Sequence, residues 1–353
     1  NIKLLYAYTY ESEEWLELYS HNGSTLNNKV DTSKMNDGVV YIKAEITDAV
    51  GNKAYSPIYE YLCDNTGPEK VNNVQCVQAL STIITLSWDD VADDDRSYFV
   101  VEKKNSDGTY SSAQNGVRKL GANLTGLTPE TEYTYRVVAY DKYNNRGVVS
   151  EDITVKTVKD TEAPVVTYLY PPSNYFNNSI DLTFTTKDDY RVEAIDIETS
   201  RDGKTWDKVT QLKATNPSAT VTFRYNLDLS KYEEGSIFVR GIVTDAYGNK
   251  TPDNKATEYE YVVDRTPAKL PISFTASSDS NYVSLQWDGV QNDSSFASYS
   301  IYRSTEKDGE YKAIKEKLTA VNMYDTSVDL GKTYYYCIMT VDKAGNRSEL
   351  SAP

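Results

Sequence analysis

The sequence predicts an all-β protein made of four tandem β-sandwich modules, elongated and without significant helix. Tyrosine, a residue that favours strands, accounts for 31 of the 353 residues. Short runs of alternating apolar and polar residues lie between turn pairs such as Asp107-Gly108 and Asp202-Gly203. No segment keeps a helical apolar period over three turns. Short strands between such turns are typical of antiparallel sandwiches.

The run of residues 133–139 shows the strand pattern most clearly. It places Tyr133, Tyr135, Val137 and Ala139 on one face of the chain and polar residues on the other. Residues 219–225 and 236–243 alternate in the same way. These segments are therefore expected to be half-buried strands.

A unit of about 200 residues occurs nearly twice along the chain. The recurring pieces are Asp48–Lys53 with Asp245–Lys250, Trp88 with Trp287, and Asp64 with Asp264. The same combination of an Asp, a nearby Thr and a Pro recurs at 64–68, 160–164 and 264–267. Proline stiffens a short extended link at each place. These marks divide the chain into four modules, at 1–67, 68–158, 159–266 and 267–353.

Two of these modules carry related motifs. Trp88 and Trp287 stand on an early strand, and the runs LTPETEY at 127–133 and LGKTYYY at 330–336 precede a late strand. On these motifs, segments 68–158 and 267–353 resemble fibronectin type III domains of bacterial extracellular proteins. The resemblance implies that the tryptophans fill the cores and that Tyr133 and Tyr334 each form a corner hydrogen bond.

Segments 1–67 and 159–266 are similar to the Ig-like modules that alternate with such domains in large bacterial surface and secreted proteins, including YD-repeat (RHS-type) proteins. Trp206 is expected in the core of the second of these. Its apparent counterpart, Trp15, has about 28 fewer residues ahead of it, roughly two strands, so module 1–67 is expected to be N-terminally incomplete. Either the sequence is a piece of a longer chain, or another chain donates the missing strand.

Composition excludes several kinds of chemistry. His21 is the single histidine and precedes the turn pair Asn22-Gly23, so no serine or cysteine nucleophile has an imidazole base in a plausible position. Cys337 is expected to be an exposed, unactivated thiol. Narrow sandwiches offer no cleft in which a carboxylic acid pair could work. We therefore expect no catalytic and no cofactor-binding residues.

Calcium is the one metal hypothesis that the sequence leaves open. Asp64, Asp160 and Asp264 lie in the links between modules, where carboxylates could supply oxygen ligands. The alternative is that aspartate at a turn binds its own backbone. The acidic run of residues 89–95 is interpreted as a solvated loop.

The net charge of −15 argues against nucleic acid as a partner, and no apolar run is long enough to enter a membrane. The resemblance implies a monomeric, non-catalytic stalk or spacer in a larger bacterial cell-surface or secreted protein, with flanking domains of the same polypeptide as its partners. The alternative is a set of adhesion or carbohydrate-binding modules attached to a polysaccharide-acting enzyme. Exposed tyrosines, with Tyr140, Tyr143, Tyr335 and the stretch of residues 168–175 as candidates, would then contact a glycan or a host or cell-surface protein.

Overall fold

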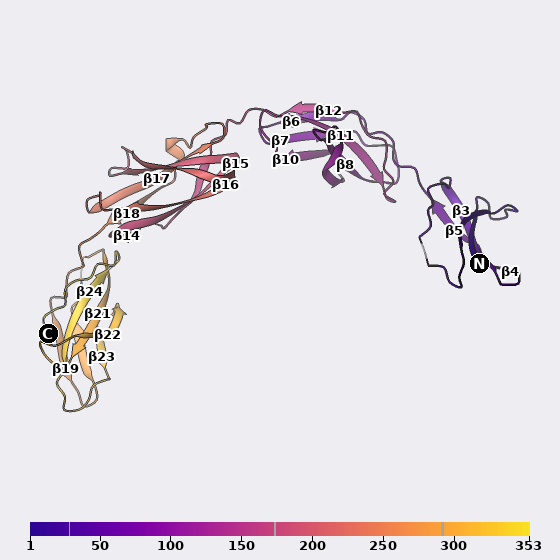
Figure 1. Ribbon diagram of the computed structural model, residues 1–353. Coiled ribbons are helices and arrows are strands. Elements are labelled where there is room, and N and C mark those ends of the chain that lie inside the picture. Colours follow the sequence, from indigo (N-terminus) through magenta and orange to yellow (C-terminus); the bar gives the residue numbers. More distant parts are fainter. Residues whose placement is uncertain (28, 173, 291–292) are drawn as a thin grey trace. The chain divides into compact units, whose positions relative to one another are not determined.

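The computed structural model describes residues 1–27, 29–172, 174–290 and 293–353. Nearly all regular elements in these ranges are strands, and the helical exception is one 3-10 turn, η1 (Asp253–Lys255) (Figure 1). The all-β prediction is confirmed. The chain divides into two compact units, Asn1–Asp160 and Thr161–Pro353. Within the described ranges, no helix has the length and apolar character needed to cross a membrane.

Residues 1–63 form one five-stranded antiparallel sheet with the order β2-β1-β3-β4, in which β5 also pairs with β3. Its strands are β1 (Ile2–Ala7), β2 (Leu16–His21), β3 (Gly38–Thr47), β4 (Lys53–Tyr55) and β5 (Tyr59–Cys63). The central strand β3 carries the alternation of β-branched and polar residues that favours a half-buried strand.

The core of this sheet is small. Its buried hydrophobic cluster consists of Met35, Val40 and Cys63. Tyr61 pairs with Val40 and therefore shares its face, yet Tyr61 is 54% exposed. Among the described residues, no second sheet covers this face.

Residues 75–156 form two facing antiparallel sheets. The smaller has the order β10-β7-β6, and the larger has the order β12-β11-β8-β9. Their strands are β6 (Gln75–Ala79), β7 (Ile83–Ser87), β8 (Arg96–Lys104), β9 (Tyr110–Val117), β10 (Gly121–Thr125), β11 (Glu132–Asp141) and β12 (Ile153–Lys156). Both sheets contribute to one buried cluster, so this region is a β-sandwich.

Trp88 lies in this cluster, 4% exposed, with its ring edge-on to Phe99 at 5.5 Å. On β11, Tyr135, Val137 and Ala139 point into the same core, which confirms the alternation read from the sequence. Tyr133 packs at its margin, and its hydroxyl accepts a hydrogen bond from the Thr128 N–H at 2.8 Å. This is the corner hydrogen bond that the resemblance implies.

Residues 165–263 form a six-stranded arrangement with the order β13-β15-β17-β18-β14, in which β16 pairs with β15 along its length. Its strands are β13 (Val165–Tyr170), β14 (Tyr175–Phe176), β15 (Ser179–Ser200), β16 (Asp207–Asp228), β17 (Gly235–Asp245) and β18 (Glu258–Val263). The register of β15 breaks between Lys187 and Val192, so its two halves serve different neighbours. The first half pairs with β13 and the second half pairs with β17.

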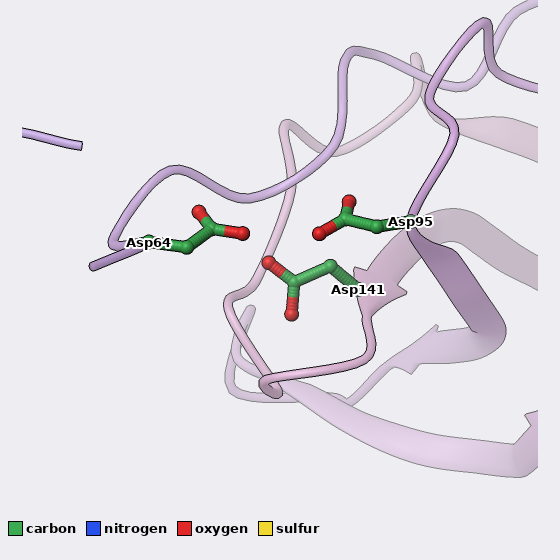
Figure 2. A group of neighbouring side chains, drawn as sticks. All are labelled: Asp64, Asp95 and Asp141. Carbon is green, nitrogen blue, oxygen red and sulfur yellow. The ribbon is translucent and has the colours of Figure 1, made fainter. Parts of the chain in front are cut away.

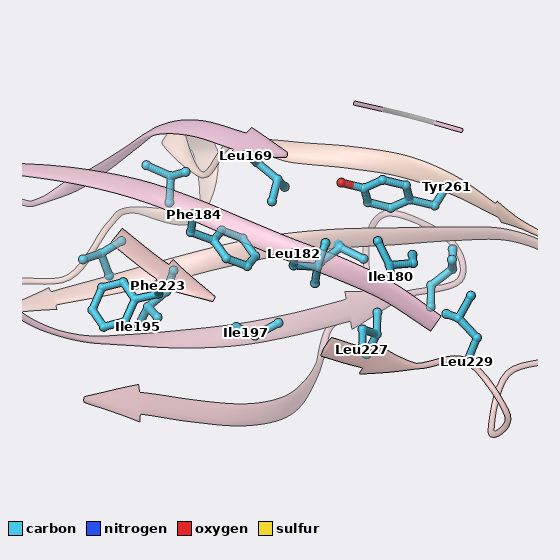
Figure 3. Close-up of a cluster of buried hydrophobic side chains, with 14 of the residues drawn as sticks. Leu169, Ile180, Leu182, Phe184, Ile195, Ile197, Phe223, Leu227, Leu229 and Tyr261 are labelled. Atoms are coloured by element: carbon cyan, nitrogen blue, oxygen red, sulfur yellow. The ribbon is translucent and has the colours of Figure 1, made fainter. Parts of the chain in front are cut away.

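The two halves of β15 face each other across the largest core of the protein (Figure 3). Phe184 from the first half and Ile195 from the second are both fully buried. They crowd Gly241 of β17 so closely that an added Cβ there would lie 2.6 Å from Ile195 Cδ1 and 3.0 Å from Phe184 Cδ1. Glycine is therefore required where the layers meet.

Trp206, expected in this core, lies outside it. The indole is half-buried at the start of β16, and the Arg240 guanidinium carbon lies 4.1 Å from its ring centre. Arg240 is itself held by Glu198 and Asp253. The ring thus contacts a cation on the outer face of the sheet, a contact that satisfies an aromatic ring without burying it in the core.

Residues 274–342 form a second pair of three-stranded sheets, β19-β20-β23 and β22-β21-β24. Their strands are β19 (Phe274–Ser278), β20 (Val283–Trp287), β21 (Phe296–Ser304), β22 (Lys312–Leu318), β23 (Asn322–Asp325) and β24 (Tyr335–Asp342). Trp287, 5% exposed, lies in their shared core. The Tyr334 hydroxyl accepts a hydrogen bond from the Asp329 N–H at 3.0 Å, repeating the corner of Tyr133 without a proline nearby.

Cys337 is not the exposed thiol that the strand alternation suggested. It is 2% exposed, although its neighbours Tyr336 and Ile338 are the ones that point into the core. Tyr311 and Ser351 interact with the thiol from outside the sheet, and burial raises the pKa of Cys337. Tyr311, which precedes β22, and Ser351 in the C-terminal segment thus lie against the thiol.

Candidate functional site

The link at residues 64–68 is held against the turn that follows β11. The Asn145 side-chain amide donates to the Asp64 carbonyl at 2.8 Å, and the Val148 N–H donates to the Pro68 carbonyl at 3.0 Å. The two backbones approach so closely that a Cβ on Gly147 would lie 2.4 Å from the Pro68 oxygen. This link is therefore docked on the sandwich rather than free in solvent.

The second unit repeats the arrangement at residues 264–268. The Asn346 side-chain amide donates to the Asp264 carbonyl at 2.8 Å, and the Thr340 hydroxyl donates to the Ala268 carbonyl at 2.5 Å. We call Asn145 and Asn346 the linker clamps. Sequence reasoning did not identify them as contacts to the links. The available signal was the fourth-residue spacing from Asp141 and Asp342, which both copies share.

Each clamp is positioned by the aspartate at the start of its turn. Asp141 is fully buried, and its Oδ1 accepts hydrogen bonds from the N–H groups of Tyr143 and Asn145 at 2.8 and 2.9 Å. Its Oδ2 accepts from the Asn145 amide at 2.8 Å. Asp342 holds Asn346 in the same way. These are the aspartate turns that the sequence offered as the alternative to calcium.

Three carboxylates gather beside the first clamp. One oxygen each from Asp64, Asp95 and Asp141 lies within 4.8 Å of the others, and Figure 2 shows the three groups pointing toward one another. Hydrogen bonding with Asp93, partial burial and the Asp64 carboxylate raise the pKa of Asp95 to about 6. The trio can share a proton or attract a hard cation. Acidic groups also gather without an ion, so the trio alone assigns no ligand.

The other linker aspartates lie in different environments. Asp160 is fully buried. Asp264 is half-buried, and burial together with the Asp342 carboxylate raises its pKa. Ser295 occupies the position in the second copy that corresponds to Asp95, because the backbone carbonyl of each accepts a hydrogen bond from the N–H of the lysine after the turn aspartate. Of the acidic run 89–95, Asp95 alone joins the trio.

The residues considered for catalysis and sugar binding are dispersed. His21 is exposed at the end of β2. Tyr168 and Tyr170 on β13 are each 51% exposed, and their rings stack with centroids 6.4 Å apart and planes inclined by 26°. Tyr175, predicted in the same stretch, lies on β14 and is half-buried. The stretch therefore presents two neighbouring exposed rings.

Comparison with known families is decisive for the sandwich of residues 75–156. Residues 68–156 match the model of the fibronectin type III domain. This region is a fibronectin type III domain. Its Trp88 core and Tyr133 corner are the features on which the resemblance rested.

Relatives extend the similarity to much of the chain. Exoglucanase B of Cellulomonas fimi is 25% identical over 298 residues, which cover 82% of this chain and 25% of the relative. An amylopullulanase of Thermoanaerobacterium saccharolyticum is 38% identical over 88 residues, 25% of this chain and 7% of the relative. The chain thus spans a quarter or less of the length of these relatives.

Solved structures with some similarity include the FN1–FN3 domains of chicken CNTN1. They are 15% identical with a TM-score of 0.38, over 81% of this chain and 97% of that one. An Fn3-like protein from Clostridium thermocellum is 30% identical with a TM-score of 0.22, over 25% of this chain and 88% of that one.

Proposed function

We propose that this chain is a non-catalytic spacer within a larger extracellular bacterial protein that acts on polysaccharide. The observation that carries the proposal is the pair of linker clamps. In each unit, an asparagine amide fixes the backbone of the link that enters a sandwich. A clamp of this kind restricts how a link can bend, which is what a spacer requires.

The filled cores support a role without chemistry. Trp88 and Trp287 occupy the interiors of their sandwiches, and large buried aliphatic and aromatic residues fill the sandwich of residues 165–263. A general acid or nucleophile needs a sheltered hollow in which its pKa can be tuned. These packed interiors leave little room for one.

The relatives supply the context. Both curated names, exoglucanase and amylopullulanase, denote enzymes that act on polysaccharide, and this chain matches only a fraction of their length. We infer that flanking domains of the same polypeptide supply the chemistry. We also propose an extracellular or cell-surface location, a monomeric state and no nucleic-acid partner, since the charge of −15 repels phosphate.

The proposed modules are 1–67, 68–158, 159–266 and 267–353. The core clusters follow this division, because each draws its members from one of these ranges. Domain-wise unfolding tests it: each excised range from 68 onward should melt cooperatively by itself. A range that unfolds unless its neighbour is present would contradict its boundaries.

Measurements of enzymatic activity and of motion at the links together test the proposed spacer function. The intact chain, incubated with cellulose, starch and pullulan, should release no reducing sugar. The double variant Asn145→Ala/Asn346→Ala should broaden the distribution of interprobe distances across each link, measured between spin labels, while Asn52→Ala serves as a control that touches no link. Sugar release by the intact chain, or unchanged distances in the double variant, would overturn the proposal.

Carbohydrate binding is the second candidate, favoured by the stacked pair Tyr168 and Tyr170. Exposed parallel rings on one strand offer a surface on which a sugar ring can stack. If this candidate holds, the intact chain binds a glycan array and the variant Tyr168→Ala/Tyr170→Ala loses that binding. An array without signal excludes it.

A further inference from the structure

Two further buried aspartates lie within the sandwich of residues 165–263, one at the register break of β15 and one at the end of β17. Asp188 is 6% exposed, and its Oδ2 accepts hydrogen bonds from the N–H groups of Tyr190 and Arg191 at 3.1 and 2.8 Å. Its Oδ1 is buried and has no hydrogen-bond partner among the described residues. A buried, unpartnered carboxylate oxygen is costly, so something is expected to satisfy it.

Asp245, at the end of β17, faces Asp188. It is 3% exposed, and its oxygens accept hydrogen bonds from the N–H groups of Tyr247 and Asn249 and from the Asn249 side-chain amide. One carboxylate oxygen of Asp188 lies within 4.8 Å of one of Asp245. Two buried negative groups are thus held at a separation that a single ion can bridge.

Among the described residues, no side-chain cation forms an ion pair with either carboxylate. The ion pairs of this sandwich, taken over the described residues to 4.0 Å, involve neither Asp188 nor Asp245. Arg191, the nearest cation in sequence, pairs with Glu193 instead at 2.6 Å. Burial, followed by the Asp189 and Asp245 carboxylates, raises the pKa of Asp188. The pair therefore repels itself and attracts a positive charge.

We propose that Asp188 and Asp245 bind a hard divalent cation of the calcium class, with Asp188 Oδ1 as a direct ligand. Both groups offer oxygen alone, which selects calcium over the metals that prefer nitrogen or sulfur. Backbone carbonyls and water complete the six to eight ligands that such an ion takes. The ion ties the register break of β15 to the end of β17 and neutralises both carboxylates.

The sequence analysis considered calcium at Asp64, Asp160 and Asp264, and the two ligands proposed here lie on β15 and β17. Asp245 appears there in the repeated piece Asp245–Lys250, whereas Asp188 was not recognised. Its significance depends on the register break that turns its side chain inward, which the sequence pattern does not reveal.

The experiment uses the intact chain with Ca²⁺ and EGTA as probes. Calcium at 1 mM is expected to raise the Tm of the unit containing residues 161–353 by about 4 °C or more relative to EGTA. Asp188→Asn should abolish that shift. The matched control is Asp48→Asn, because Asp48 makes the same turn bonds to Val50, Asn52 and the Asn52 amide but is exposed on its own sheet.

Terbium luminescence provides a second readout that does not depend on how stable a variant is. Tyr190 and Tyr247 follow the two carboxylates, with ring centres 6.0 Å apart, and can transfer excitation to a bound Tb³⁺. Calcium-displaceable emission should fall in Asp188→Asn and persist in Asp48→Asn. The proposal is overturned if EGTA leaves the wild-type Tm unchanged, or if both variants retain equal calcium responses. It is also overturned if Asp188→Asn alters only the pH dependence of Tm, since the pair then shares a proton.

Discussion

The sheet of residues 1–63 and the sandwich of residues 165–263 share a plan and differ in what covers it. In each, a central strand, β3 or β17, ends in the same aspartate turn, at Asp48 or Asp245. A cation lies over a tryptophan in both: Lys43 Nζ is 3.9 Å from the Trp15 ring centre, and Arg240 covers Trp206. The local features are thus nearly identical.

The cores are not. The first cluster holds three buried residues, whereas the second holds sixteen, drawn from two facing layers. Strand pairs and hydrogen-bonded turns therefore form without a second layer. Extensive burial of apolar side chains requires that layer. Since that burial dominates folding stability, the two regions should respond very differently to substitution.

The largest difference should come from deleting a large side chain. Phe184→Ala empties the fully buried centre of the sandwich and should lower the free energy of unfolding by about 3–5 kcal/mol. Tyr61→Ala, on the uncovered face of the small sheet, should change it by about 0.5 kcal/mol or less. Urea unfolding, monitored in each region by hydrogen exchange, measures both changes in the free energy of unfolding. Equal losses would show that the small sheet is covered in solution.

A docked link distinguishes the turn after β11 from the turn after β3. Gly147→Ala places a methyl group against the Pro68 carbonyl, so it should destabilise the first unit by about 1–3 kcal/mol. Gly289→Ala is the control, because its nearest neighbour, a Val321 methyl, lies 3.7 Å from the new Cβ. Thermal denaturation reports both. A neutral Gly147→Ala would mean that the link is not seated as described.

A smaller effect isolates the clamp from the turn. Asn145→Ala loses the bond to the Asp64 carbonyl as well as its side-chain bond to Asp141, whereas Asn52→Ala loses only its side-chain bond to Asp48. The difference should be about 1 kcal/mol, the net value of one hydrogen bond. Chemical denaturation of the two variants gives it. Equal free energies of unfolding for the two variants would show that the clamp does not contribute to stability.

The smallest effect is in pH dependence, where Asp95 of the sandwich of residues 75–156 and Asp48 of the small sheet should contribute with opposite signs. The pKa of Asp95 in the folded protein is about 6, above its ordinary value, so its contribution is present at low pH and lost as pH rises from about 4 through 6. Hydrogen bonds from Asn52 and the turn backbone lower the pKa of Asp48, so its contribution is lost as pH falls below about 4. Tm measured from pH 3 to 8 for Asp95→Asn and Asp48→Asn distinguishes them, and parallel profiles would contradict this.

Much of the architecture was predictable because it is encoded locally. Alternation along residues 133–139 predicted the strand and its buried face, and the turn residues predicted where strands end. The environment of Trp88 followed from the family motif. These features depend on neighbours in sequence, which a linear reading contains.

What could not be predicted depends on contacts distant in sequence. Alternation assigns a side of a strand but not what covers it, so Cys337 was placed outside although Tyr311 closes over it. Trp206 was placed in a core because of its residue type, whereas Arg240 holds it on the outer face. The clamps and Asp188 depend on a link or a register break reaching across the fold.

The distribution of the three thiols gives the molecule a built-in reporter. Cys76 is exposed, Cys63 belongs to the three-residue cluster of the single sheet, and Cys337 lies beneath Tyr311 in the other unit. A maleimide reagent should therefore modify one position at once. The second modification then times the opening of the small sheet, and the third times the loss of the C-terminal sandwich, all within one unmutated chain.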